Sequence, residues 1–248
     1  MTIIRKDDLI DSVADALQYI SYYHPLDFIK AMENAYNKEL NPAAKDAIAQ
    51  ILINSRMCAE GKRPICQDTG IVTCFVKIGM QVQWDSDMTV QEMIDEGTRR
   101  AYTCPDNTLR ASVVADPAGA RKNTKDNTPA VVHVEMVPGD KVEVLIAAKG
   151  GGSENKTKMV MLNPSDDIAE WVEKTLPSMG AGWCPPGMLG IGIGGTAEKA
   201  AVMAKEALME SCDIQELIER GPQTAEEKLR LDIYQRVNKL GIGAQGLG

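Results

Sequence analysis

The order of helical and extended patterns along the chain constrains its fold more than any other feature. In the N-terminal third, apolar residues recur at helical spacing, as they do from Lys6 to Tyr22, and helical patterns return towards the C-terminal end. Strands are predicted in three stretches, 71–84, 130–148 and 187–193, and the first two contain β-branched runs. The sequence therefore predicts a mixed α/β (α+β) fold with a helix-rich N-terminal third, a central β-sheet and C-terminal helices.

Capping signals predict where three of the helices begin. The signals are Asn41 before Pro42, Thr89 with Glu92 three residues later, and Thr224 with Glu227 three residues later. The helices that follow are expected to end near residues 61, 102 and 241.

The middle of the chain carries turn signals as well as strand signals. Arg121 to Pro129 is polar and rich in turn-forming residues, which predicts a surface loop. The β-branched runs 130–137 and 141–148 flank Pro138-Gly139-Asp140, and this arrangement predicts a β-hairpin.

Composition favours a globular protein with a sizeable core. The chain has 248 residues, of which 44% are hydrophobic, and we expect a single domain over residues 1–248. Lys and Arg number 27 against 35 Asp and Glu, so the net charge of −8 argues against nucleic-acid binding through a broad basic surface. The sequence shows no apolar signal segment and no apolar span that could cross a bilayer, so we expect a cytoplasmic protein without a membrane partner.

The six cysteines are spread widely, which does not suggest a disulfide scaffold in a chain without an export signal. There is no Cys-x-x-Cys pair, and His24 and His133 are the only histidines, so a local zinc finger cannot be assembled. Cys58 and Cys74 fall on apolar faces of a predicted helix and strand, and we assign them to the core. Any metal site must therefore draw its ligands from distant segments.

The stretch Cys66-Gln67-Asp68-Thr69-Gly70 carries the most specific chemistry. It places a potential metal-ligating thiolate, an amide and a carboxylate side by side, between a predicted helix and a β-branched run. A turn needs the glycine and at most the aspartate, and a core cysteine gains nothing from a carboxylate beside it. The stretch therefore predicts a loop that binds a metal or takes part in catalysis.

Two glycine-rich segments are further candidates. Three consecutive glycines lie within Lys149 to Lys156, directly after a predicted strand, which indicates unusual dihedral angles or a close approach of the main chain to another group. The Ser, Glu and Asn that follow favour a binding loop over a flexible linker. Gly190 to Gly195 fits G-x-G-x-x-G, but Cys212 to Ile218 has a helical pattern where a dinucleotide site needs a strand with an acidic end. Glycines before a helix can equally serve a carboxylate.

Four motifs follow one another along the chain: Cys66-Gln-Asp-Thr-Gly70, Lys149-Gly-Gly-Gly-Ser-Glu-Asn155, Cys184-Pro-Pro186 and Gly241-Ile-Gly-Ala-Gln245. Together they resemble the iron–sulfur-dependent class I fumarate hydratases, and more closely their α subunit or N-terminal domain. The resemblance covers nearly the whole chain. Tartrate dehydratase α subunits share the architecture, although the segment Lys149 to Lys156 is more similar to the fumarate hydratases.

The resemblance implies a [4Fe–4S] cluster held by three cysteines, with one iron open to substrate. On this basis Cys66 and Cys184 are two of the ligands, and Cys212 is a structural residue. The family's third cysteine lies beyond the loop at Gly243 to Gly246, where this sequence ends. We therefore expect the domain to be truncated at its C-terminal end and the chain alone to hold no stable cluster.

The same resemblance implies a hydro-lyase that reversibly hydrates fumarate to L-malate. It makes Asp68 the candidate acid/base or hydroxyl-orienting group, since the reaction moves a proton to or from carbon. Gln67, Arg110 and Gly152 are the candidate substrate-binding residues. The planar guanidinium of Arg110 suits a substrate carboxylate, and Gly152 would act through its amide.

The resemblance further implies a β subunit or C-terminal domain as partner, in a heterotetramer or a homodimer. The expected carbon-proton base, a threonine, and further cationic residues belong to that partner, so the chain alone should be inactive or nearly so. Three other readings are open: a tartrate dehydratase or mesaconase α subunit, a non-catalytic dicarboxylate-binding subunit, and a nucleotide-binding protein.

Overall fold

The structure is a computed structural model that describes residues 2–180, 182 and 186–248, and it divides into two compact units. Unit 1 comprises Met1–Tyr23 and Ser55–Glu154, and unit 2 comprises His24–Asn54 and Asn155–Gly248. The single domain predicted over residues 1–248 stays a prediction. The mixed α+β class is confirmed, because helices and short sheets both occur.

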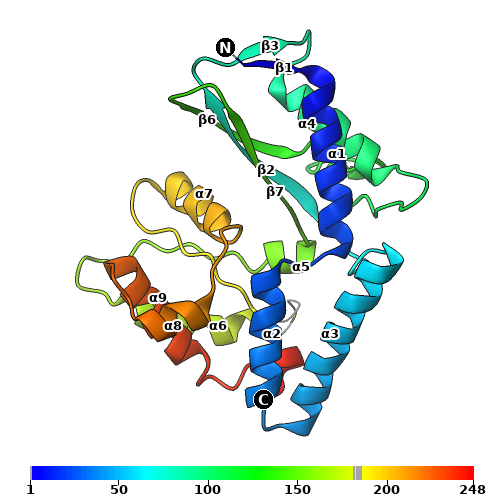
Figure 1. Cartoon of the computed structure of the whole chain (residues 1–248). Coiled ribbons are helices and arrows are strands. Elements are labelled where there is room, and N and C mark those ends of the chain that lie inside the picture. The colour runs from blue at the N-terminus through cyan, green and yellow to red at the C-terminus, as the bar shows by residue number, and fades with distance from the viewer. Residues whose placement is uncertain (1, 181, 183–185) are drawn as a thin grey trace. The chain divides into compact units, whose positions relative to one another are not determined.

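Unit 1 is built on a three-stranded sheet with the order β6-β2-β7 (Figure 1). The central strand, β2 (Ile71–Gly79), pairs in parallel with β6 (Val131–Val137) and antiparallel with β7 (Val142–Lys149). In this register Cys74 lies opposite Val132 on one side and Ile146 on the other.

Two helices cover one face of this sheet. They are α1 (Lys6–Tyr22) and α4 (Val90–Tyr102), and their apolar residues pack with those of the sheet in one core. The predicted helix from Lys6 to Tyr22 is thus confirmed. Cys74 is completely buried in this core, as predicted, and burial raises the pKa of its thiol to about 12.

The predicted hairpin of residues 130–148 was wrong, because β6 and β7 lie on opposite sides of β2 instead of pairing with each other. The turn between them crosses the end of β2, where the Gln81 amide donates to the Gly139 carbonyl at 2.9 Å. A Cβ atom at Gly79 would lie 2.4 Å from that carbonyl oxygen. Gly79, which has no side chain, therefore lets the connection pass over the strand end.

Short ladders complete the strands of unit 1. β1 (Ile3–Arg5) pairs in parallel with β3 (Gln83–Asp85), and β4 (Val114–Ala115) pairs antiparallel with β5 (Lys122–Asn123).

Unit 2 is helical in its described part. α2 (Leu26–Lys38) packs with α3 (Pro42–Gly61), which runs on into unit 1, and with the short helix η1 (Ala244–Gly246). A second cluster joins α6 (Ile168–Met179) to α9 (Ala225–Val237). The remaining helices of unit 2 are α7 (Ala197–Ala207) and α8 (Ile214–Arg220).

The three predicted capping signals are confirmed. The Asn41 Oδ1 atom accepts from the Ala43 amide at 2.9 Å at the start of α3. Thr89 and Glu92 form a reciprocal capping box at the start of α4, and the Thr224 hydroxyl accepts from the Glu227 amide at the start of α9.

The strand predicted over residues 187–193 is absent from the described residues, which have no regular secondary structure there and belong to no ladder. Two of its glycines lie directly on α7. A Cβ atom at Gly190 would lie 2.1 Å from the Ala204 carbonyl oxygen, and one at Gly192 would lie 2.0 Å from that of Ala200. These two glycines of the G-x-G-x-x-G match are thus needed for close packing of the segment against the helix.

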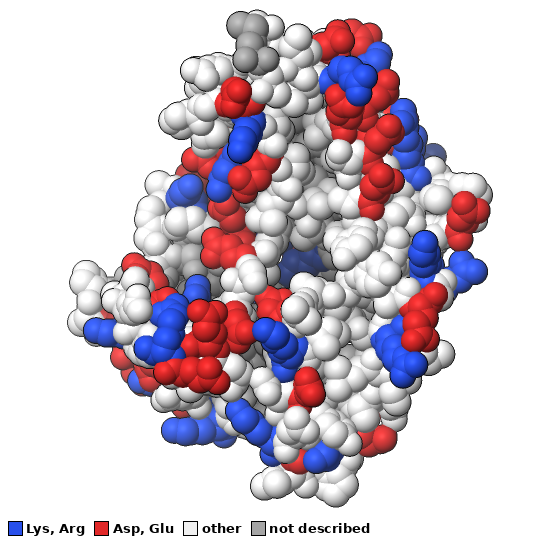
Figure 2. Space-filling view, viewed as in Figure 1, with Lys and Arg blue, Asp and Glu red and all other residues white. Residues whose placement is uncertain are grey.

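Two observations bear on partners. In the part of the chain that the structure describes, no helix is both long and apolar enough to cross a membrane. On the face shown in Figure 2, Lys and Arg side chains are interspersed with Asp and Glu, and no broad basic surface is seen.

Candidate functional site

The loop that contains Cys66 lies between α3 and the central strand β2. Just before it, the Ile65 amide donates to the Ser21 carbonyl at the end of α1 at 2.8 Å. Cys66 is half-buried, and its Sγ atom lies 3.5 Å from Oε1 of the exposed Gln67. The loop therefore presents its thiol and amide at the surface of unit 1, on a main chain fixed at its start.

Asp68 connects this loop to the glycine-rich segment. One carboxylate oxygen, Oδ1, accepts from the Gly70 amide at 3.1 Å, and Oδ2 accepts from the Gly151 amide at 2.9 Å. The two amides hold the carboxylate in one orientation. A carboxylate offers roughly four acceptor positions, so others remain for a ligand.

The glycine-rich segment forms a tight turn. β7 ends at Lys149, and α5 (Gly151–Glu154) follows as one helical turn, with Gly152 exposed. A Cβ atom at Gly150 would lie 3.1 Å from the Asp68 Oδ2 atom, so a side chain there would crowd the carboxylate. The Lys149 ammonium lies 3.2 Å from the Glu154 carboxylate and closes the turn. The predicted close approach of the glycines to another group is confirmed, and that group is Asp68.

Arg110 is joined to the same loop through Thr69. The Thr69 hydroxyl accepts from the Arg110 amide at 2.9 Å and donates to the Arg110 carbonyl, also at 2.9 Å. The neighbouring Leu109 is buried in the core of unit 1, whereas Arg110 is exposed. Its backbone is therefore fixed while its side chain faces outward.

Two buried side chains hold the Cys66 loop from the side of the core. The Tyr102 hydroxyl donates to the carbonyls of Thr69 and Gly70, at 2.7 and 3.0 Å. Burial raises the pKa of Tyr102, so this hydroxyl stays protonated and remains a donor. The Asn127 side chain, which is completely buried, donates to the Gly70 carbonyl at 3.0 Å and accepts from the Ser112 amide at 2.8 Å.

The position of Asn127 corrects the surface loop predicted over residues 121–129. Most of that loop is exposed, but Asn127 points inward and has a positive φ of 63°, which asparagine tolerates better than most residues. Sequence reasoning missed Asn127, Tyr102 and Thr69. One signal for Asn127 was available in the sequence. An asparagine among turn-forming residues can adopt a left-handed backbone conformation, so it need not be a solvent-exposed polar residue.

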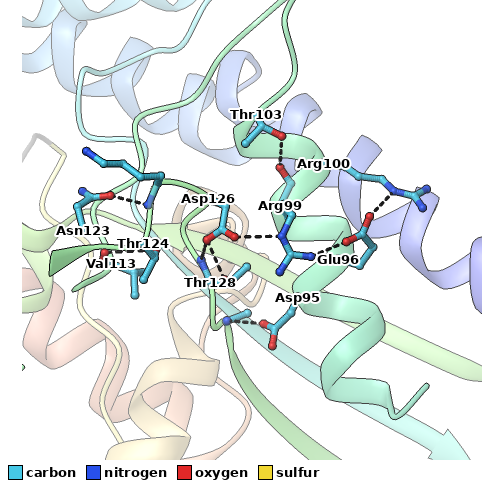
Figure 3. A network of polar contacts seen from close by, with 12 residues as sticks. Asp95, Glu96, Arg99, Arg100, Thr103, Val113, Asn123, Thr124, Asp126 and Thr128 are labelled. Atoms are coloured by element: carbon cyan, nitrogen blue, oxygen red, sulfur yellow. Dashed lines mark hydrogen bonds and ion pairs between the residues drawn. The ribbon is translucent and has the colours of Figure 1, made fainter. Parts of the chain in front are cut away.

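Helix α4 anchors this loop through a network of ion pairs and hydrogen bonds (Figure 3). Asp126, next to Asn127, accepts from Arg99 of α4 at 3.0 Å, and Asp95 of α4 accepts from the Ala130 amide at 2.7 Å. The loop is thereby held to α4 on both sides of Asn127. This keeps the buried Asn127 side chain against the Cys66 loop.

The structure brings five of the six predicted site residues into one region of unit 1. Cys66, Gln67 and Asp68 lie on one loop, Arg110 is tied to it through Thr69, and Gly152 is tied to it through the bond between Asp68 and Gly151. Cys184 lies outside the described residues. The catalytic, substrate-binding and ligand roles of all six remain predictions.

The described cysteines differ in their fitness as metal ligands. Cys58 and Cys74 are buried, and burial raises the pKa of both thiols, so they suit a structural role. Cys66 lies half-buried on a loop and fits one thiolate position of an iron–sulfur cluster. Among the described residues, no group of three or more His, Cys, Asp or Glu is arranged to hold a metal ion. Cys212, which we predicted to be structural, is also half-buried, and its amide donates to Asp27 at 3.2 Å.

Comparison with known proteins finds similarity over nearly the full chain. The family model described as Fumarate hydratase (Fumerase) matches residues 10–248. A Methanocaldococcus jannaschii protein provisionally named L(+)-tartrate dehydratase subunit alpha is 34% identical over 244 residues, which cover 96% of this chain and 83% of the relative. The L(+)-tartrate dehydratase subunit alpha of Escherichia coli strain UTI89 is 28% identical over 246 residues, which cover 96% of this chain and 78% of the relative.

Proposed function

The chain belongs to the fumarate hydratase family of hydro-lyases as a member of the α-subunit type, and from this premise we propose that it carries part of an active site that adds water to a C4 dicarboxylate. The proposed reaction is the reversible hydration of fumarate to L-malate. The partner is a β subunit or an equivalent C-terminal domain, which the subunit names of the relatives support.

The observation that carries the proposal is the link between the main-chain segments that bear a carboxylate and a guanidinium. Asp68 and Arg110 belong to segments joined by two hydrogen bonds through Thr69. Within the described residues we find no hydrogen bond or ion pair for the Arg110 guanidinium, so it is available for a substrate carboxylate. Asp68, held by two amides, has acceptor capacity left for the substrate hydroxyl or for a proton.

Cys66 and Cys184 would be two of the three thiolate ligands of a [4Fe–4S] cluster. When bound, such a cluster offers one iron as a Lewis acid towards the substrate. The residues of this chain would do the remaining work. Arg110 would bind a carboxylate, Gln67 and the Gly152 amide would orient the substrate, and Asp68 would orient the hydroxyl or move a proton.

Two substrates have specific support. The sequence from Lys149 to Lys156, with its run of glycines, favours fumarate through its resemblance to the fumarate hydratases. The names of the relatives favour L(+)-tartrate as the second candidate. L-Malate, the hydrated form of fumarate, and L(+)-tartrate differ by one hydroxyl group on the same four-carbon dicarboxylate.

The assay that tests this function compares the chain alone with its complex. We expect negligible turnover of fumarate by the purified chain, because groups needed for the reaction come from the partner. After co-expression with the partner subunit and anaerobic reconstitution with iron and sulfide, we expect turnover of fumarate, measured against L(+)-tartrate and mesaconate. Full fumarase activity of the chain alone would contradict the need for a partner. A reconstituted complex that contains a cluster but acts on none of the three would refute the hydro-lyase role.

Asp68→Asn tests the role of the carboxylate in that complex. We expect kcat to fall by about 100-fold or more with little change in KM, since general acid–base groups contribute on this scale. The matched control is Asp116→Asn, because the Asp116 carboxylate also accepts from a backbone amide, that of Ala120 at 2.7 Å, on an exposed loop of unit 1. An unchanged kcat for Asp68→Asn would assign Asp68 to loop support alone.

A further inference from the structure

The Thr69 side chain makes both of its described hydrogen bonds to the main chain of one residue, Arg110. Its single hydroxyl accepts from the Arg110 amide and donates to the Arg110 carbonyl, both at 2.9 Å. A hydroxyl has one donor and can accept at the same time, so both of its functions are directed at one residue. That residue lies 41 positions away in the sequence.

We infer that Thr69 is a positioning residue that sets where Arg110 stands relative to Asp68; the inference rests on the proposed function. Thr69 follows Asp68 directly, so a displacement of Asp68 is passed to the Arg110 backbone through two hydrogen bonds. The required distance between a carboxylate-binding group and a proton-handling group is set by the length of the substrate. Displacement of the Arg110 guanidinium by even about 1 Å would therefore weaken its contact with the substrate carboxylate and lower kcat/KM.

The rest of Thr69 is itself fixed, so it can act as a rigid spacer. Its carbonyl accepts from the buried Tyr102 hydroxyl at 2.7 Å. The segment after Arg110 is held separately, because the Asn127 side chain accepts from the amides of Ser112 and Val113. Thr69 alone, among the side chains described, bonds to the main chain of Arg110 itself.

The test uses Thr69→Val, which keeps the shape of the side chain and removes the hydroxyl. In the active complex we expect KM for the dicarboxylate to rise about tenfold, the scale of one or two lost hydrogen bonds, with a smaller change in kcat. Thr69→Ser, which keeps the hydroxyl, should have the same KM as the wild-type complex. The matched control is Thr103→Val, which removes a hydroxyl bonded to the Arg99 carbonyl at the end of α4.

A double-mutant cycle decides whether Thr69 acts through Arg110. If it does, Thr69→Val should raise KM much less in an Arg110→Gln background than in the wild type, because the group that it positions is gone. Equal effects in both backgrounds would overturn the inference, since Thr69 would then act on binding independently of Arg110.

Amide hydrogen exchange supplies a readout that does not depend on activity. Thr69→Val should accelerate exchange of the Arg110 amide, while Thr69→Ser and Thr103→Val should not. A complex that is inactive on every dicarboxylate would refute the proposed function, yet the exchange result would still test the link between the two residues. If Thr69→Val changes neither the exchange of the Arg110 amide nor KM, the inference about Thr69 is refuted while the proposed function stands.

Discussion

Replacing Cys66 by serine is expected to abolish both cluster binding and turnover in the complex with the partner subunit. A serine hydroxyl is a poor replacement for a thiolate at iron, and loss of a direct ligand should cost at least as much as loss of a supporting residue, about 100-fold. The measurements are iron and sulfide content after anaerobic reconstitution, electron paramagnetic resonance and turnover. Because Cys66 is half-buried on a loop, circular dichroism should show an unchanged fold.

Cys212→Ser is the matched control, since Cys212 is also half-buried but is predicted to be structural. We expect this variant to keep the iron content of the parent complex. Iron content that survives Cys66→Ser, or that is lost in Cys212→Ser, would contradict the proposed assignment of ligands.

Gly70→Ala is expected to be among the most destabilising single changes in unit 1. Gly70 has a φ of +85°, and a Cβ atom there would lie 2.5 Å from the backbone carbon of Ala148 in β7. The strained dihedral and the clash with main chain should together cost about 3 kcal/mol or more of the free energy of unfolding. Urea unfolding followed by circular dichroism measures this change.

Gly139→Ala separates the two causes. Gly139 also has a positive φ, +111°, but a Cβ atom there would meet nothing within 4 Å. Its replacement should therefore cost only the dihedral term, about 1 kcal/mol. Equal losses for the two variants would show that contact with β7 does not matter at Gly70.

Local signals predicted the helices of this protein well because the causes of helix formation lie within a few residues. Capping at Asn41 and Thr89 and the apolar spacing from Lys6 to Tyr22 each act over one or two turns. The strands β2 and β7 were predictable from their β-branched residues for the same reason.

Strand pairing was not predictable from the same signals. The runs on either side of Pro138-Gly139-Asp140 fit a hairpin locally, yet β2 lies between them. The connecting turn passes over Gly79, far away in the sequence, where the absence of a side chain admits it. The sequence pattern alone does not show which glycine will lie against which turn in the folded chain.

The sequence predicted the candidate site residues but not the residues that hold them in place. The thiol, amide, carboxylate and guanidinium were visible as chemistry in the sequence. The side chains that hold them, Thr69, Tyr102 and Asn127, act on main-chain atoms of distant segments. Such contacts produce no periodic pattern in the sequence, so they are seen only in the folded structure.

The central position of β2 has a consequence for folding during synthesis. A ribosome releases this apolar strand before either of its neighbours in the sheet exists, because residues 131–149 follow much later. Until then the backbone groups of β2 have no ladder partners in the sheet, and an unpaired apolar strand is prone to aggregation. The Asp68 carboxylate likewise cannot meet the Gly151 amide before that point. The contacts that hold Asp68 in the Cys66 loop can therefore be completed only after residue 151 has been synthesised.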